Sequence, residues 1–206
     1  ATRPGRALIG LCDWIETDFS ASHLRRLLQS GDMGIEADEE GFNSGQAART
    51  LTRAEAGWGR ATYGLALGAL RKGYEARGAD PDRSDDERQD ARTKADLTSA
   101  VAAWIEKLVA AIPDSDVHGR VPLQTVVTAA LEYVDRSTAR SSQLDHRAAA
   151  AVTDHLNELR ALGTFSCTLT EALRFIRDQI VDVQLAPIEG VLIVPVLRNT
   201  HDSITS

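Results

Sequence analysis

The chain has 206 residues, of which 43% are hydrophobic and 26% charged, and its formal net charge is −7. These values are typical of one large globular domain or two small ones, and no apolar run reaches the roughly 18–20 residues that a membrane-spanning helix needs. Nucleic-acid-binding modules gain affinity mainly by neutralising phosphates with Lys and Arg, so the negative charge disfavours tight DNA binding by this chain alone.

The first 31 residues predict two helices. Residues 7–16 form the first, and the second runs from an N-cap at Ser20 to a stop at Gly31. Their apolar residues recur at spacings of three and four, which gives the stripes Leu8, Leu11, Cys12 and Ile15, then Leu24, Leu27 and Leu28. The pair predicts a helical hairpin that docks on the rest of the chain.

An acidic, glycine-bearing loop is expected over 32–45, with Phe42 as a buried anchor, followed by a short helix over 46–55. The next stretch, 56–78, is interpreted as the central core helix of the protein. Its apolar stripe is Tyr63, Leu67, Leu70 and Tyr74.

Three other residues of this stretch carry expectations of their own. Gly64 and Gly68 lie four apart within the helix, which predicts that another backbone comes close there, since glycine is unfavourable in a helix interior. Trp58 stands just before the helix and is expected to bury its ring.

The segment 79–96 is almost free of apolar residues and alternates in charge sign, so it predicts a solvated linker or a frayed helix start. Four helices are expected after it. They are 97–112, one opened by Pro122 at its first turn, 143–162 ending at Gly163, and a last helix with Thr168 and Glu171 as a capping box. Residues expected to be buried in the last two include Leu162, Leu173, Phe175, Ile176, Ile180 and Val183.

The period changes at 190–197, GVLIVPVL, a short valine-rich run that is typical of a buried strand and is the one convincing strand signal in the sequence. A lone strand leaves its N–H and C=O groups unpaired. It therefore pairs either with a copy of itself in an oligomer or with a sheet in sequence not present here. The second option, together with the absence of an initiator Met, leads us to expect a fragment of a larger protein.

The predicted fold class is all-α, a multi-helix bundle with one C-terminal β-strand that is unpaired or pairs outside the chain. We expect an N-terminal helical hairpin plus central helix at 1–78, a charged linker at 79–96, a helical bundle at 97–186, and the strand and tail at 187–206. Together these parts make one helical domain.

No complete catalytic or cofactor motif is found. The five histidines do not pair at zinc-ligand spacing with one another or with a cysteine, so we expect no metal and no cofactor. Cys12 and Cys167 lie far apart without C-x-x-C partners, which predicts two buried free thiols in a reducing, cytoplasmic compartment, with one long-range disulfide as the alternative.

Several features, in this order, resemble one family. They are the hairpin LIGLCDWIETDFSASHLRRLLQSGD, the helix WGRATYGLALGALRKGY, and the paired helices around Trp104 and Pro122, followed by a final helix that leads into the strand. The order is similar to the helical insertion of the second motor domain in AddB- and RecC-type subunits of bacterial recombination helicase–nucleases, which are related to superfamily 1 helicases.

The family pattern W-x-x-G-L-x-x-x-L-x-G-Y is matched at Gly64, Leu65, Gly73 and Tyr74, whereas Trp58 is displaced. The resemblance implies a non-catalytic subdomain of a helicase-like exonuclease subunit in DNA double-strand-break repair and recombination, which shapes the DNA path and the contacts between domains. Its partners would be the rest of the parent chain and a second helicase–nuclease subunit, with DNA bound through the parent complex and no membrane.

Any ATPase or nuclease activity would then lie outside this segment. The cations expected to contact DNA phosphates are Arg25, Arg26, Arg71, Lys72 and Arg77. Solvated helix faces are the other interpretation of these charges. The alternative function is an autonomous all-α protein-interaction module that homodimerises through the strand at 191–197.

Overall fold

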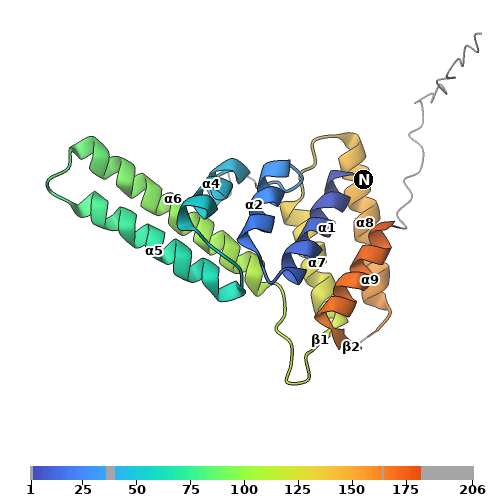
Figure 1. Ribbon diagram of the computed structural model, residues 1–206. Helices are drawn as coiled ribbons and strands as arrows, with labels where there is room; N and C mark the ends of the chain where they lie inside the picture. Colours follow the sequence, from blue (N-terminus) through green and yellow to red (C-terminus); the bar gives the residue numbers. More distant parts are fainter. Residues whose placement is uncertain (1, 36–39, 164, 182–206) are drawn as a thin grey trace, which may run out of the picture.

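The computed structural model describes residues 2–35, 40–163 and 165–181 (Figure 1). Within these residues the chain forms eight helices and one two-stranded sheet, which confirms the all-α fold class. The helices are α1 (Arg3–Glu16), α2 (Ala21–Ser30), α4 (Ser44–Ala54), α5 (Arg60–Ala79), α6 (Asp85–Ala110), α7 (Leu123–Ser137), α8 (Gln143–Ala161) and α9 (Leu169–Val181), and the strands are β1 (Arg120–Pro122) and β2 (Ser166–Thr168).

The helices α1, α7, α8 and α9 pack on one another as a bundle, and α2 and α4 continue it on one side. Beyond α4, α5 and α6 run antiparallel and extend away from the bundle as a long two-helix hairpin (Figure 1). We call this feature the α5–α6 hairpin. Among the described residues, none of the helices combines the length and the apolar character that a membrane span requires.

The N-terminal hairpin and its loop match the expectations. The stop at Gly31 is confirmed, since this residue has φ +74° and ends α2. Phe42 is 1% exposed, and its ring packs edge-on against Trp104 with centroids 6.1 Å apart. Cys12 and Cys167 are buried free thiols, so the alternative of a disulfide between them is wrong.

The interpretation of 56–78 as the central core helix is wrong. Tyr63, Leu67 and Tyr74 are buried, but the stripe that they form packs mainly on α6, and α5 lies at the side of the molecule. Trp58 is 73% exposed. A Cβ added at Gly64 or Gly68 would meet nothing within 4 Å, so the expected close backbone contact is absent from the described residues. One apolar stripe on each helix is enough to hold two helices together as a hairpin. A helix with such a stripe can therefore lie at the edge of the molecule.

The segment 79–96, expected as a solvated linker or a frayed helix start, contains a tight turn and the first three turns of α6, so the helix-start alternative is the better one and the helix runs through the expected boundary at 96–97. Ala91 and Ala95 are buried against α5, and Gly78 of α5 lets α6 come close, because a Cβ there would lie 3.0 Å from Arg92 Cγ. Small residues thus make a helix–helix contact that a search for large apolar residues misses. The alternating charges lie on the exposed side, where Lys94 pairs with Asp90 one turn earlier at 2.5 Å.

The start of α6 is fixed by a capping box. Ser84 Oγ accepts from the Glu87 amide at 3.3 Å. In return, the Ser84 amide and the Ser84 hydroxyl both donate to Glu87 Oε2 at 3.0 Å, and these two bonds to the carboxylate lower the pKa of Glu87. Replacing Ser84 with alanine is expected to cost about 1 kcal/mol of helix stability. Amide hydrogen exchange in the first turn of α6 should therefore speed up about fivefold. Thr93→Ala, in the middle of the same helix, is the control that leaves this turn unchanged.

The one strand predicted from the sequence, at 190–197, lies outside the described residues, so both the strand and its pairing stay predictions. Within the described residues, β1 pairs antiparallel with β2, placing the buried Val121 opposite Cys167. Strands of three residues are too short to show a period of two, which explains why they were missed. Since Pro122 belongs to β1, it precedes α7 as its N-cap and does not lie inside the first turn.

The C-terminal helices follow the prediction at their ends and differ at two side chains. The Thr168–Glu171 capping box is confirmed: the Thr168 amide donates to Glu171 Oε2 at 2.8 Å, and the Glu171 amide donates to Thr168 Oγ1 at 3.2 Å. Leu162, expected to be buried, is 70% exposed because it follows the last turn of α8 as its C-cap. Phe175 is 38% exposed and packs edge-on against Phe165, so the apolar residues predicted for the last helix cover a wider arc of α9 than the bundle does. Val183, the fifth of them, lies outside the described residues.

Candidate functional site

Two of the five predicted DNA-contact cations lie on α2. Arg25 is half-buried, and its Nη1 donates to Thr52 Oγ1 of α4 at 3.3 Å, so this side chain joins two helices. Arg26 is exposed. Neighbours in a helix point about 100° apart, so the two guanidinium groups do not share one face.

The other three predicted cations lie on α5, and all are exposed. Arg71 pairs with Glu75 at 3.4 Å and donates to Ser99 of α6 at 3.4 Å, while the Arg77 guanidinium carbon lies 5.7 Å from the centre of the Tyr74 ring. Lys72 has no ion-pair partner among the described residues. At 100° per residue, Arg71, Lys72 and Arg77 point in three different directions around α5.

The five cations therefore do not form one basic patch. Figure 1 shows α4 between α2 and the α5–α6 hairpin. The concentration of charge is on α5, which carries four cations and one carboxylate. Its neighbour α6 begins with three acidic residues in its first turn, so the hairpin as a whole is not a basic arm.

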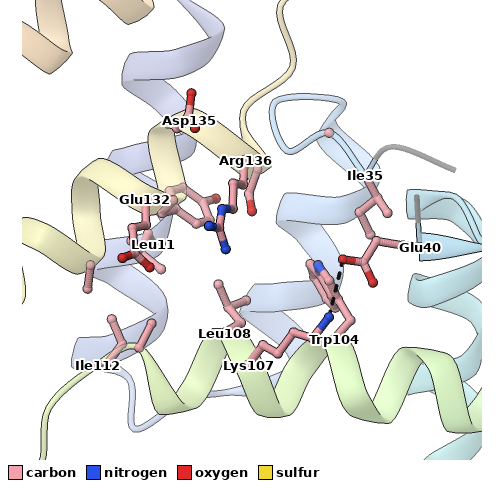
Figure 2. Close-up of a pocket in the computed structure, with 15 residues that line it drawn as sticks. Leu11, Ile35, Glu40, Trp104, Lys107, Leu108, Ile112, Glu132, Asp135 and Arg136 are labelled. Atoms are coloured by element: carbon pink, nitrogen blue, oxygen red, sulfur yellow. Dashed lines mark ion pairs between the residues drawn. The ribbon is translucent and has the colours of Figure 1, made fainter. Parts of the chain in front are cut away.

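A second candidate is a groove of about 470 Å³ between the C-terminal half of α6 and α7 (Figure 2). Its floor is apolar and includes Leu11, Trp104, Leu108 and Ile112. Charged side chains from three parts of the chain stand around it, namely Glu40, Lys107, Glu132, Asp135 and Arg136. Lys107 and Glu40 approach to 4.0 Å across one end.

This groove has the features of a ligand pocket. Its size falls within the range of such pockets, and charged groups around an apolar floor orient a ligand. Among its described lining residues no nucleophile is paired with a base, and the buried Tyr133 donates to the Ala7 carbonyl at 3.3 Å. The groove was missed in the sequence because its lining comes from four separate segments, and no local pattern marks them.

The titratable groups outside the groove include one deeply buried thiol. Burial raises the pKa of the Cys12 thiol to about 12, which leaves it protonated and unreactive at neutral pH. The described residues contain no group of three or more His, Cys, Asp or Glu side chains placed to hold a metal ion. His155 lies 4.0 Å from Glu158 on the surface of α8, and His201 is outside the described residues.

Comparison with known proteins leaves the assignment to these observations: no protein-family model, no curated protein and no solved structure matches this chain.

Proposed function

We propose that the chain is a non-catalytic helical subdomain of a helicase-like exonuclease subunit that acts in DNA double-strand-break repair and recombination, where it shapes the path of DNA and holds neighbouring domains. The proposal originates in the resemblance to AddB- and RecC-type subunits. In the described residues, the hairpin of that resemblance corresponds to α1 and α2, the tryptophan helix to α5, and the paired helices to α6 and α7.

The observation that carries the proposal is the extended α5–α6 hairpin, which presents Arg71, Lys72 and Arg77 to solvent away from the bundle (Figure 1). A projecting helix pair with exposed cations is able to contact a phosphate backbone while its root stays packed on α4. The negative net charge of the chain favours a role as one part of a larger DNA-binding complex and disfavours DNA binding by the chain alone.

The test uses the gene product that contains this segment and a fluorescent duplex with one open end. The logarithm of the binding constant falls linearly with the logarithm of salt, by about 0.9 per phosphate contact. Replacing Arg71, Lys72 and Arg77 together by glutamine should make this slope shallower by about 1 to 2, because the three side chains point in different directions around α5 and do not all reach one phosphate backbone. The folded helix content should stay unchanged.

The matched control neutralises three exposed cations elsewhere, Arg136, Arg160 and Arg174, which changes the net charge equally. Its slope should equal that of the unaltered protein. If both triple variants change the slope by the same amount, the effect is one of net charge, and the α5 cations are not phosphate contacts. If neither changes it, the hairpin does not contact DNA.

A further inference from the structure

One side of α5 is apolar although no described residue covers it. We define the outer face of α5 as the positions that fall within a sector of about 100° on the helix, at 100° per residue. They are Ala61, Leu65, Gly68, Ala69, Lys72, Ala76 and Ala79. All are exposed except the half-buried Gly68, and Leu65 is 75% exposed. A single residue of the seven is charged.

The composition of this face is unusual for a helix at the surface. The opposite side of α5 already carries the buried Tyr63, Leu67 and Tyr74, so apolar residues lie on two sides of the helix. A helix that faces solvent has charged or polar residues on its outer side, whereas a helix that is apolar on both sides is normally covered on both. The neighbouring α6 follows the first rule, with Asp90, Arg92 and Asp96 exposed.

Space for a covering element lies directly beside the outer face. A cleft of about 970 Å³ runs between α5 and α6. Small residues, among them Gly64, Gly68, Ala102 and Ala103, line part of it, and the charged Arg60, Arg71, Glu106 and Asp114 line the rest together with larger apolar residues. A Cβ at either glycine would meet nothing within 4 Å, so another backbone can come closer here than side chains normally permit. The close contact that the two glycines suggested in the sequence is thus available, but to something beyond the described residues.

The one charged residue on the outer face of α5 indicates which charge the covering element carries. Lys72 stands seven positions after Leu65, on the same line along the helix, and has no ion-pair partner among the described residues. An ammonium group that is covered without a partner is strongly unfavourable. Whatever covers the face must therefore supply a carboxylate about two helical turns from the residue that contacts Leu65.

We propose that the outer face of α5 is a docking surface for one amphipathic helix of another polypeptide, whose apolar ridge packs on Leu65 and the adjacent alanines and whose carboxylate pairs with Lys72. Trp58, exposed at the N-terminal end of α5, is held there by its neighbours, because the Gly57 carbonyl accepts from Ala21 and the Gly59 amide donates to Asp18. An exposed tryptophan whose backbone is fixed on both sides is available as an interface anchor near the start of α5.

The inference deepens the proposed function, and it rests on that function for the origin of the helix, since a subdomain that holds neighbouring domains needs such a surface. The face itself stands on the geometry. Because Lys72 belongs to both proposals, other residues separate them. Leu65→Asn should weaken peptide binding and leave the salt slope of the DNA experiment unchanged, whereas neutralising Arg71 and Arg77 alone should change that slope and leave peptide binding intact.

The probes are two synthetic 18-residue helical peptides that carry leucines at spacings of three and four on an Ala/Gln background. One peptide has Glu seven residues from the central leucine, and the other has Lys at that position. Fluorescence anisotropy with the 206-residue chain should show the Glu peptide binding about tenfold more tightly than the Lys peptide. The variant Lys72→Glu should reverse that order.

Leu65→Asn should weaken binding of the Glu peptide at least about tenfold. Leu162→Asn is the matched control, because Leu162 has a similar exposure, 70%, and lies at the end of α8 and not on α5. It should leave the affinity unchanged. Circular dichroism of each variant should match the unaltered chain, since neither leucine contributes much to the core.

Three results of the peptide experiment would overturn the inference. They are no binding of the Glu peptide, equal effects of the two leucine variants, and the same peptide preference in the chain and in Lys72→Glu. Sedimentation of the chain without peptide tests the other occupant: a dimer that Leu65→Asn converts to a monomer would show that a second copy covers the face, and the proposed partner helix would be wrong.

Discussion

Replacing Trp104 with alanine is expected to lower the free energy of unfolding by about 3–5 kcal/mol, the range for a large aromatic removed from a core. Trp104 is 7% exposed and packs edge-on against Phe42, the residue that anchors the loop after α2. It also forms part of the floor of the groove between α6 and α7. The substitution thus removes buried apolar area and leaves a cavity that rigid helices on either side fill only partly. Urea unfolding at an unchanged m-value measures the loss.

The chain provides its own control in a second tryptophan. Trp58 is 73% exposed, so Trp58→Ala should change the free energy of unfolding by less than about 0.5 kcal/mol. Comparable losses in the two variants would mean that Trp58 is buried in solution, and the position assigned to α5 would be wrong.

Replacing Tyr63 with phenylalanine is expected to cost about 2–4 kcal/mol, although it removes a single oxygen atom. Trp14 Nε1 donates to the Tyr63 hydroxyl at 2.9 Å, and that hydroxyl donates to the Phe19 carbonyl at 2.7 Å, all in the buried region where α5 meets α1. Without the oxygen, a buried N–H and a buried carbonyl both lose their partner, and each such loss costs about 1–3 kcal/mol. Burial raises the pKa of Tyr63 to about 12, so the phenol is neutral and able to donate across the physiological range.

Tyr133→Phe is the matched control, because Tyr133 is equally buried but makes one long hydrogen bond, 3.3 Å, to the Ala7 carbonyl. It should cost less than about 1.5 kcal/mol. Thermal unfolding followed by circular dichroism compares the two variants under one set of conditions. If Tyr133→Phe is the more damaging, the Trp14–Tyr63–Phe19 chain does not make the main polar contribution at the root of the α5–α6 hairpin.

The helices were predictable because their evidence is local. Spacings of three and four mark their apolar stripes, Gly31 supplies the left-handed residue that ends α2, and the Thr168–Glu171 pair starts α9. The segment 79–96 was misjudged because its helix contact uses Ala91, Ala95 and Gly78, residues that carry too little hydrophobicity to stand out. The strands β1 and β2 were missed for a different reason, since their pairing joins residues 46 positions apart.

The candidate sites were less accessible to prediction. Four of the five predicted DNA-contact cations are neighbours in sequence, Arg25 with Arg26 and Arg71 with Lys72, but a helix separates neighbours by about 100°. The fold in addition places Arg25 against Thr52 and Arg71 against Ser99. The outer face of α5, in contrast, corresponds to a local pattern in the sequence, namely alanines, a leucine and a lysine at helical spacing. It was not recognised, because the same helix also carries an apolar stripe and was therefore placed in the core.

The sequence by itself determined where most of the helices run, that the fold is all-α and that both cysteines are buried, since propensity, periodicity and capping act over a few residues. The tertiary structure alone decided that α5 lies at the periphery, which of its two apolar sides is covered, and that α6 and α7 enclose a groove. These outcomes depend on which apolar stripe packs against which other stripe. Contacts between segments far apart in the chain decide this, and a local sequence pattern does not show such contacts.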